Sequence, residues 1–255
     1  MIKENQIKKG LKEGKSYFGT FVKIPDPSAV EVLALSGLDF IVIDNEHTVM
    51  STESTQNLIR AANIYNLVVS VRVKKNDAAE ILQALDSGAY GVQVPQTNSK
   101  SDVEQVVSSV KYAPLGSRGY AASQRSASYG FMDAAEYARL SNENTLVSCY
   151  CETKAAIDNL DEMLSVNELD ILFIGPFDLS QALGVTGRPR DPVVMKAIRE
   201  ITAKALKAKK AVGIIASDIE QTKQWLDMGI QYIVISSDLG MIASQAKAFI
   251  GALKI

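Results

Sequence analysis

Eight short apolar runs, each followed by a segment of helical character, constrain the fold of this chain more than any other feature. Most of the runs are continuously apolar rather than alternating, which is typical of strands buried on both faces. We therefore expect eight buried strands. They are Tyr17–Val22, Phe40–Ile43, Val68–Val73, Gly91–Pro95, Thr145–Cys151, Ile171–Ile174, Val212–Ala216 and Tyr232–Ile235.

Helical segments fill the intervals between these runs. Several begin after a residue type that favours a helix N-cap, namely Asn76 or Asp77, Ser99, Asp218 and Asp238. The clearest predicted helices are Pro27–Ser36, Ser51–Tyr65, Asp77–Leu85, Ser99–Lys111, Lys154–Ser165, Pro192–Ala208, Ile219–Met228 and Met241–Leu253.

This alternation predicts an α/β protein with a parallel (β/α)8 barrel, or TIM barrel, that occupies residues 1–255 as a single domain. A doubly wound open sheet is the alternative, because the same alternation of strands and helices builds it. That fold usually carries a glycine-rich turn after its first strand, and no G-x-G-x-x-G pattern follows Phe18-Gly19-Thr20. The barrel is therefore favoured.

The chain contains one histidine, His47, and two cysteines, Cys149 and Cys151. A single histidine excludes a multi-histidine zinc site within one chain. Two cysteines in a C-x-C spacing are too few for a zinc ribbon or a disulfide framework. Any metal site in this chain must therefore be built mainly from oxygen ligands.

Charge and hydropathy exclude several classes of partner. The net charge of −2 provides no basic field that would recruit nucleic acid. The first ten residues are polar rather than signal-like, and no apolar run approaches the ~18–20 residues of a membrane span. We expect a cytoplasmic protein that acts on small molecules, without a nucleic-acid or membrane partner.

The segment 112–144 does not fit the regular alternation, because it is too long for a plain connection. It contains a proline- and glycine-rich stretch followed by a short predicted helix, Met132–Leu140. Such an excursion serves a site, a lid or an interface. The alternative is a packed surface insertion without a role in the chemistry.

Charged residues follow several of the predicted strands at their carboxyl ends, where the active sites of (β/α)8 barrels lie. Asp44, Glu46 and His47 follow the second strand, and Arg72 lies at the end of the third. Glu152 follows the fifth strand and Asp178 follows the sixth. Charge at the end of an apolar strand is costly unless it is paired or bound to a ligand.

Glu152 and Asp178 end neighbouring strands, so the two carboxylates can converge on one cation. Two oxygen ligands, with the other positions left to water and substrate, are typical of Mg²⁺ or Mn²⁺. The alternative is that each carboxylate caps the next helix or pairs with an arginine. From the spacing alone the two interpretations are equally good.

His47 is a candidate general base, because histidine titrates near neutral pH. The alternative is a loop or core histidine satisfied by hydrogen bonds. Asp44 and Glu46 could orient the His47 ring or hold water bound to a metal. For Glu46, the interpretation as a surface or structural carboxylate without such a role is equally good.

Arg72 suits an oxyanion or a keto oxygen, because both need a permanent donor. The alternative is a buried pair with Asp44 or Glu152. The neighbouring Lys74 and Lys75 raise the rival chemistry of a Schiff base, but neither lies within an apolar strand.

Asp86 ends the third predicted barrel helix, where a carboxylate opposes the helix dipole. That position indicates a compensating role, although such helices end on the face away from the active site. If Asp86 is catalytic, it acts on the site of a neighbouring subunit or its helix is displaced. The alternative is a solvated aspartate in a turn.

The turn from Gly175 to Ser180 leads from a strand into a helix, where backbone N–H groups can bind a carboxylate. The alternative is an ordinary capped turn.

Six motifs occur in an order and spacing that resemble the HpcH/HpaI aldolase family, over nearly the whole chain. They are Asp44-x-Glu46-His47, Val71-Arg72, Leu85-Asp86-x-Gly88-Ala89, Tyr112-x-Pro114-x-Gly116-x-Arg118-Gly119, Glu152-Thr153 and Gly175-Pro176-x-Asp178-Leu179-Ser180. The resemblance implies a (β/α)8 barrel and a class II pyruvate aldolase that depends on Mg²⁺, Mn²⁺ or Co²⁺. It also implies a homo-oligomer, a trimer or hexamer, with the last helix exchanged between subunits.

The resemblance further implies a role for each matching residue. Glu152 and Asp178 correspond to metal ligands, Arg72 to the residue that holds the keto oxygen and the enolate, and His47 to the base. Asp86 corresponds to a carboxylate that makes the histidine more basic. The turn at Gly175, Phe177 and Asp178 corresponds to the pocket for the pyruvate carboxylate. Tyr150 stands where many members have glutamine, which bears on how the substrate is held.

The implied reaction is the reversible cleavage of a 4-hydroxy-2-oxo acid to pyruvate and an aldehyde, through a metal-stabilised pyruvate enolate. A citryl- or malyl-CoA lyase-like enzyme is the first alternative, and no added basic patch for CoA phosphates is visible. A non-catalytic barrel that binds 2-oxo acids is the second.

Overall fold

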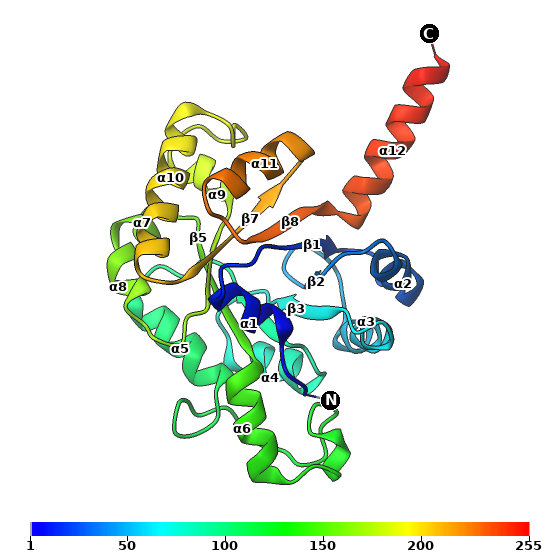
Figure 1. Ribbon diagram of the computed structural model, residues 1–255, viewed down its shortest axis with the longest axis vertical. Helices are drawn as coiled ribbons and strands as arrows, with labels where there is room; N and C mark the ends of the chain where they lie inside the picture. The colour runs from blue at the N-terminus through cyan, green and yellow to red at the C-terminus, as the bar shows by residue number, and fades with distance from the viewer. Residues whose placement is uncertain (1, 255) are drawn as a thin grey trace.

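The computed structural model describes residues 2–254, and within them eight parallel strands close into a barrel (Figure 1). Each strand pairs with the next along the chain, and the last pairs with the first. The barrel prediction is confirmed and the open sheet is excluded. The strands are β1 (Tyr17–Val22), β2 (Phe40–Asp44), β3 (Val68–Arg72), β4 (Gly91–Val94), β5 (Leu146–Cys151), β6 (Ile171–Ile174), β7 (Ala211–Ala216) and β8 (Tyr232–Ser237).

The continuous apolar runs are explained by burial on both strand faces. Every residue of β2, β5 and β6 is buried. One set of side chains fills the barrel interior, where Phe40 stacks on Tyr232 and Tyr150 stacks on Phe173. The other set packs outward against the helices, so the sheet has no solvated face.

The helices match the predicted segments with one correction. The segment predicted as Lys154–Ser165 is two short helices, because the backbone leaves helical geometry at Asn159. Helices α1 and α9 were not among the predicted ones. The helices are α1 (Gln6–Lys12), α2 (Pro27–Leu35), α3 (Thr52–Ile64), α4 (Ala78–Asp86), α5 (Lys100–Val110), α6 (Ala134–Asn144), α7 (Lys154–Asp158), α8 (Leu160–Leu164), α9 (Pro176–Ala182), α10 (Pro192–Lys207), α11 (Ile219–Asp227) and α12 (Asp238–Leu253).

The side chains of Asp77, Ser99 and Asp218 accept hydrogen bonds from the first turns of their helices, which confirms the predicted N-caps. The predicted cap Asp238 is wrong, because Ser237 caps α12. The carboxylate of Asp238 instead turns back and accepts the backbone N–H groups of Lys23 and of the residue after it. Asp238 therefore ties the start of α12 to the loop that follows β1.

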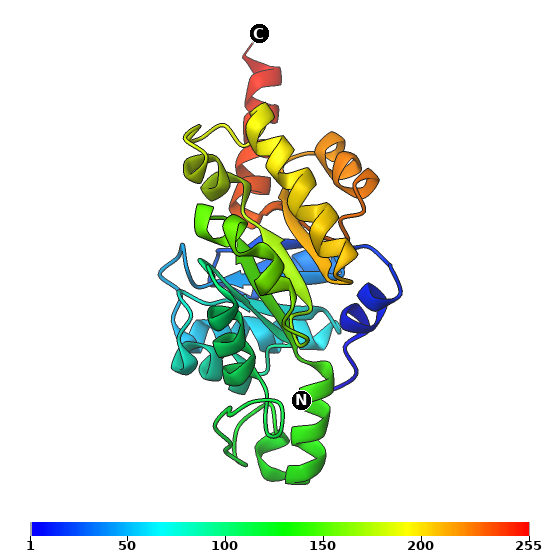
Figure 2. The ribbon, with the colours of Figure 1, turned by 90° about the vertical axis from the view of Figure 1, so that its left-hand side faces the viewer.

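The excursion 112–144 contains α6 and a short 3-10 turn, Ser128–Gly130, and lies at one end of the molecule (Figure 2). It is joined to the barrel through Arg118, whose guanidinium donates to Asp86 at 2.6 Å. The same guanidinium lies over the ring of Tyr112, 4.8 Å from its centroid. The excursion is thus packed onto the barrel through a buried arginine.

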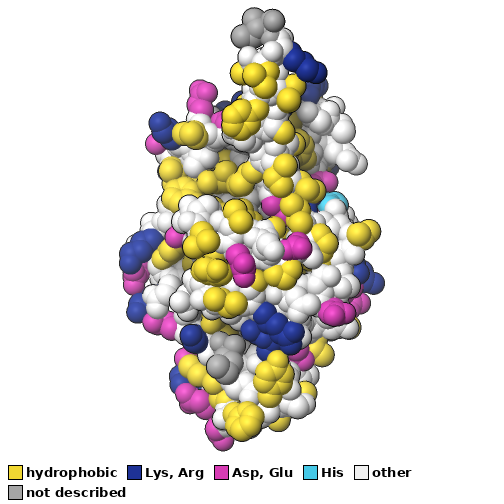
Figure 3. All heavy atoms as spheres, turned by 90° about the vertical axis from the view of Figure 1, so that its right-hand side faces the viewer, with side chains coloured by type: hydrophobic (Ala, Val, Ile, Leu, Met, Phe, Trp, Pro, Cys, Tyr) yellow, Lys and Arg dark blue, Asp and Glu magenta, His cyan; other side chains and the backbone are white. Residues whose placement is uncertain are grey.

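Helix α12 projects away from the barrel at the opposite end of the molecule (Figures 1 and 2). Many of its hydrophobic side chains are exposed to solvent, and Figure 3 shows them along the projecting helix. Phe249 is 64% exposed and Leu253 is 79% exposed. None of the helices within residues 2–254 is long and apolar enough to cross a membrane.

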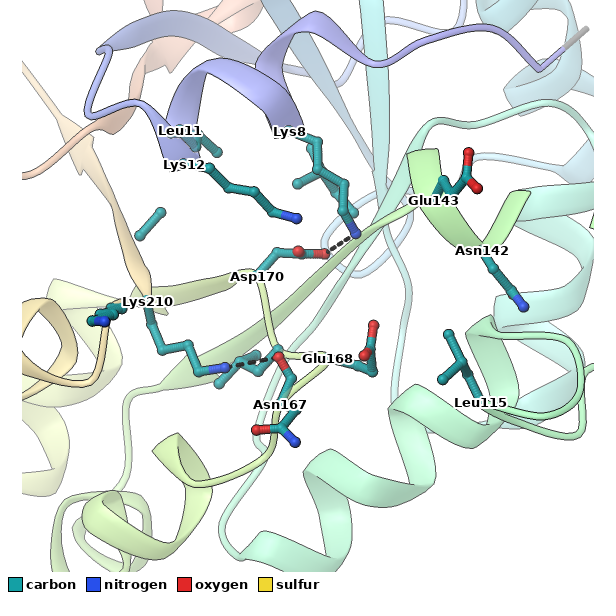
Figure 4. A pocket seen from close by; sticks show the side chains of 14 residues that line it. Lys8, Leu11, Lys12, Leu115, Asn142, Glu143, Asn167, Glu168, Asp170 and Lys210 are labelled. Atoms are coloured by element: carbon teal, nitrogen blue, oxygen red, sulfur yellow. Dashed lines mark hydrogen bonds and ion pairs between the residues drawn. The ribbon is translucent and has the colours of Figure 1, made fainter. Parts of the chain in front are cut away.

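The amino-terminal end of the barrel is closed by α1, whose Ile7 and Leu11 pack against the interior aromatic residues. Lys8 of the same helix points to Asp170, which lies just before β6 (Figure 4). This end of the barrel therefore carries charged groups of its own.

Candidate functional site

A pocket of about 450 Å³ opens at the carboxyl ends of the strands, the face predicted to carry the chemistry. It brings together most of the residues singled out by their positions in the sequence. Among its lining residues are His47, Arg72, Tyr150, Glu152, Gly175, Phe177 and Asp178.

Asp44 and Arg72 form a bidentate ion pair next to this pocket. The register of β2 and β3 places the two residues opposite one another. The Nε and Nη2 atoms of Arg72 donate to the two carboxylate oxygens of Asp44 at 3.0 and 2.7 Å. Burial opposes ionisation of Asp44, but the hydrogen bonds and charge of Arg72 hold the pKa of Asp44 below its ordinary value. The alternative considered for Arg72, a buried pair with Asp44, therefore exists, and Arg72 lines the pocket as well.

Glu46 lies between Arg72 and His47. Its Oε2 is 3.3 Å from Nη1 of Arg72 and 3.5 Å from Nε2 of His47. Burial raises the pKa of Glu46 above its ordinary value. The backbone N–H groups of Glu46 and His47 both donate to Asp44, which holds this turn against the end of β2. The His47 side chain is 55% exposed, so a substrate can reach it.

Glu152 is a buried carboxylate with few compensating partners. Burial in the first place, with help from the nearby Asp178 and Glu46, raises the pKa of Glu152 to about 7. The backbone N–H of Gln96 donates a hydrogen bond to Oε1 of Glu152 at 2.8 Å, and this bond lowers the pKa of Glu152. Within residues 2–254 no lysine, arginine or histidine forms an ion pair with Glu152, which leaves the carboxylate available to a cation.

Gly175 allows the chain to approach Glu152 closely. A Cβ atom at Gly175 would lie 2.4 Å from Oε2 of Glu152, so any side chain at this position would displace the Glu152 carboxylate. The register of β5 and β6 sets Glu152 beside Gly175, and Asp178 follows in the first turn of α9. Among the described residues, no group of three or more histidine, cysteine, aspartate or glutamate side chains forms a closed metal cage. The donors present fit an open site with two carboxylate ligands.

Tyr150 lines the pocket with its ring, while its hydroxyl is used elsewhere. The hydroxyl donates to Oε1 of Gln93 at 2.7 Å, and Nε2 of Gln93 donates in turn to Tyr232. Burial raises the pKa of Tyr150 well above its ordinary value, so the phenol stays neutral. This residue contributes an aromatic surface to the pocket.

Asp86, Lys74 and Lys75, which were also considered from the sequence, do not line this pocket. Asp86 lies at the end of α4 and pairs with Arg118, where burial raises the pKa of Asp86 above its ordinary value. Lys74 and Lys75 are 55% and 72% exposed, and they lie close to carboxylates of α4 and its cap. Their positions give no support to a Schiff-base lysine at either residue.

The structure also brings in pocket residues that the sequence reasoning missed. Lys23 follows β1 directly, and the strand-end rule applied to the other strands would have found it. Arg190 reaches the pocket from the loop between α9 and α10, and no local signal marks it. The backbone of Gln96, which holds Glu152, has a positive φ of 54° that is uncommon outside glycine.

The chain is similar to proteins of a known family. The family model of HpcH/HpaI aldolase/citrate lyase matches residues 17–244. The chain is 31% identical over 245 residues to the 4-hydroxy-2-oxo-heptane-1,7-dioate aldolase of Shigella sonnei (strain Ss046), covering 96% of this chain and 93% of that protein.

Two solved structures show the same fold at high similarity. An HpcH/HpaI aldolase/citrate lyase family protein from Burkholderia cenocepacia J2315 superposes with a TM-score of 0.93 at 27% identity, covering 98% of this chain and 100% of that one. The citrate synthase SbnG superposes with a TM-score of 0.88 at 30% identity, covering 97% and 96%.

The family model extends over most of the chain, and the relatives match it along nearly its full length. The resemblance carried by the six motifs is therefore confirmed, as is the aldolase class that it implied. This chain belongs to the HpcH/HpaI aldolase/citrate lyase family.

Proposed function

We propose that this protein reversibly cleaves a 4-hydroxy-2-oxo acid to pyruvate and an aldehyde with the help of a divalent cation. The observation that carries the proposal is the unpaired, buried Glu152 in the same pocket as Arg72 and His47. The pocket therefore combines a carboxylate open to a cation, a fixed guanidinium and an accessible imidazole.

Glu152 and Asp178 are the residues that hold the cation in this proposal. Carboxylate oxygens in an open site suit Mg²⁺, Mn²⁺ or Co²⁺. The chemistry that such a cation supplies is Lewis-acid polarisation of the 2-oxo group. Gly175 and the N–H of Gln96 keep Glu152 in place for this task.

Arg72 is proposed to bind the keto oxygen and to stabilise the negative charge that develops on it. Its contact with Asp44 fixes the planar guanidinium, so the donors are aligned before substrate arrives. Phe177 and Asp178 are proposed to receive the pyruvate carboxylate through their backbone N–H groups. The ring of Tyr150 is proposed to pack against the substrate.

His47 is proposed to accept the proton of the 4-hydroxyl group, directly or through water, as the C3–C4 bond breaks. The freed electron pair forms the enolate of pyruvate, and a proton delivered to C3 then gives pyruvate. The carboxylate of Glu46 lies 3.5 Å from Nε2 of this imidazole.

Asp86 does not line the pocket of its own chain, so we propose that it supports His47 of a neighbouring subunit. The proposed assembly is a trimer or hexamer in the cytoplasm, in which α12 is exchanged. The solvent-exposed apolar residues of α12 support this exchange, because apolar side chains gathered on one helix are normally buried against another surface. Removing residues 241–255 should lower the molar mass measured by light scattering to that of smaller assemblies.

The decisive experiment combines His47→Ala with removal of the cation. The variant should retain Mn²⁺ binding by calorimetry, because the proposed ligands are Glu152 and Asp178, while turnover falls about 100- to 10,000-fold. A chelator should abolish wild-type activity and Mg²⁺, Mn²⁺ or Co²⁺ should restore it. Chelator-resistant activity together with borohydride trapping of pyruvate on a lysine would refute the proposal.

A citryl- or malyl-CoA lyase-like reaction is the second candidate, because the matching family model covers citrate lyases as well as aldolases. Exchange of pyruvate protons in D₂O without any CoA ester separates the two reactions. Binding of pyruvate and Mn²⁺ without exchange would instead indicate a non-catalytic barrel.

A further inference from the structure

The floor of the pocket is built from aromatic side chains of the barrel interior. Phe21 of β1, Tyr150 of β5 and Phe173 of β6 all line the pocket, and all three are buried members of the interior core. We call these three residues the aromatic floor. They form the apolar bottom of a pocket whose proposed catalytic groups lie at the strand ends.

The aromatic floor lies directly beneath two of these groups. Tyr150 precedes Glu152 by two residues, and side chains two residues apart in an extended chain point the same way. The Tyr150 ring is therefore one layer deeper than Glu152, about 6–7 Å along the strand. The guanidinium of Arg72 rests on the floor as well, since its Cζ lies 4.5 Å from the centroid of the Phe21 ring. A 2-oxo acid held between Glu152 and Arg72 thus lies over the aromatic floor.

The rings of the floor are packed against one another without spare room. Tyr150 and Phe173 are stacked with their centroids 4.5 Å apart, and Phe173 meets Phe21 edge-on at 6.4 Å. The register places Phe173 opposite Gly213, where an added Cβ would lie 2.6 Å from Cδ2 of the phenylalanine ring. Phe173 has therefore filled the space that the glycine leaves. Interiors packed in this way resist the insertion of even one methylene group.

A hydrogen bond from below holds the ring of Tyr150 in place. The register sets Gln93 of β4 beside Ser148, which lies two residues before Tyr150 and so one layer deeper. The hydroxyl of Tyr150 donates to Oε1 of Gln93 at 2.7 Å, and Nε2 of Gln93 donates to the hydroxyl of Tyr232 at 3.3 Å. Gln93 and Tyr232 are both buried. The Tyr150 ring therefore has no free space into which it could tilt to deepen the pocket.

We propose that Tyr150 is a specificity-determining residue that limits the 2-oxo acid to one with an unsubstituted methyl group at C3. This inference rests on the proposed aldolase function and adds to it the size of the 2-oxo acid that the pocket accepts. Polar groups of the pocket take up the carboxylate and keto oxygens of the acid, so its C3 end meets the apolar floor. The extra carbon of 2-oxobutanoate would press against rings that are held from below.

The first measurement compares the binding of pyruvate and 2-oxobutanoate by calorimetry in the presence of Mg²⁺. Wild type should bind pyruvate at least about tenfold more tightly, because one methylene group changes selectivity about 10- to 200-fold in apolar pockets. Tyr150→Leu opens the floor and should reduce this difference about tenfold. Equal binding of the two acids by wild type would overturn the proposal.

The second measurement is the exchange of C3 protons in D₂O, followed by NMR without any aldehyde. The quantity is kcat/KM for pyruvate divided by kcat/KM for 2-oxobutanoate. The intrinsic acidity of each acid is the same for every variant, so a change in this ratio reports on the pocket. Tyr150→Leu should lower the ratio about tenfold. Tyr150→Phe keeps the ring but loses the bond to Gln93, and it should lower the ratio by less than Tyr150→Leu does.

Tyr137→Leu is the matched control. Tyr137 is 1% exposed, as Tyr150 is, and its hydroxyl is also hydrogen-bonded, but it lies in the excursion and does not line the pocket. This control should keep the wild-type ratio. Tyr150→Met, whose flexible side chain fills more of the space, provides the same test if the leucine variant does not fold.

The ratio separates selection by Tyr150 from a purely structural role. If the ring only supported the barrel, Tyr150→Leu would slow the exchange of both acids alike and leave the ratio unchanged, which would overturn the proposal. A lower ratio for Tyr150→Phe than for Tyr150→Leu would also overturn it, because selection would then depend on the hydroxyl rather than the ring. Failure of wild type to exchange pyruvate protons at all would instead count against the aldolase function itself.

Discussion

The two ends of the barrel both hold buried charges, but within residues 2–254 the ends differ in how fully the chain itself pairs these charges. At the amino-terminal end, Lys8 and Lys111 lie beside Asp170 (Figure 4 shows Lys8 and Asp170). At the carboxyl-terminal end, Glu152 faces the pocket with a single backbone donor. The charges of a structural cluster are paired within the chain, whereas Glu152 has room for a ligand.

The amino-terminal cluster is satisfied from within the chain. Lys8 donates to the carbonyl of Thr145 and to Asp170, both at 2.8 Å. Lys111 donates to the carbonyls of Asn142 and Thr145 at 2.7 and 2.9 Å. Each ammonium group has protein acceptors in reach, so this end closes the barrel and needs no ligand.

The carboxyl-terminal cluster is satisfied only in part. Asp44 has Arg72, Lys23 and two backbone donors, whereas burial raises the pKa of Glu152 to about 7. An unpaired carboxylate in a pocket is costly to keep in the charged form. The cation proposed to bind Glu152 would offset this cost.

The largest effect is expected from Arg72→Met, because this residue serves both stability and chemistry. Loss of the guanidinium leaves buried Asp44 without its main partner, which should lower the free energy of unfolding by about 3–5 kcal/mol. Turnover of the folded fraction should fall about 100- to 1000-fold through loss of the oxyanion donor. Urea titration and steady-state kinetics measure the two effects; a normal kcat would contradict the proposed role.

Lys8→Met tests the other end of the barrel. Breaking its buried pair with Asp170 should also lower the free energy of unfolding by about 3–5 kcal/mol. The kcat of the folded fraction should stay at the wild-type value, because the change lies at the opposite end from the pocket. The exposed Lys9→Met, 58% exposed in wild type, is the matched control and should change neither quantity. A loss of kcat in Lys8→Met would show that the two ends are coupled.

Glu152→Gln should stabilise the protein in the presence of a chelator while abolishing its activity. The raised pKa of Glu152 means that ionisation costs folding free energy as the pH rises from 4.5 through about 7. Removing the charge should therefore raise the free energy of unfolding at pH 8 by on the order of 1–3 kcal/mol. Asp44→Asn should do the reverse, because the pKa of Asp44 is lowered. Equal signs for the two variants would refute this distinction.

Lys111 should give stability a slope with pH rather than a change at one pH. Burial, with help from Lys8, lowers the pKa of Lys111 from 10.5 to about 7. Between these values the unfolded chain holds a proton that the folded chain has released, so stability rises with pH. The difference between wild type and Lys111→Met should change by up to about 1.4 kcal/mol per pH unit above pH 7. A flat difference between pH 7 and 10 would show that the lysine is not buried in solution.

Local patterns in the sequence were sufficient to predict the strands, most of the helices and the charged residues at the strand ends. Strand β6 was predicted at its observed bounds, Ile171–Ile174, because a short apolar run between polar residues is a local signal. Asp44, Arg72 and Glu152 were found because parallel strands must all end on one face of the barrel. Their convergence follows from topology once the alternation of strands and helices is known.

Contacts between distant segments could be decided only by the tertiary structure. Asp238 looked like a helix cap, but closure of the barrel between β8 and β1 turns its carboxylate to the backbone of Lys23. Arg190 entered the pocket through a loop whose path no local pattern specifies.

The sequence by itself therefore determined the barrel, the family and the identity of the chemical groups, since these depend on periodicity and on order along the chain. The tertiary structure alone decided which charges are paired and which are not. Asp44 and Glu152 look alike as residues that follow apolar strands, but only the register of β2 with β3 supplies one of them with an arginine. Pairing depends on distances of a few ångströms between segments far apart in the chain, and no one-dimensional pattern encodes such distances.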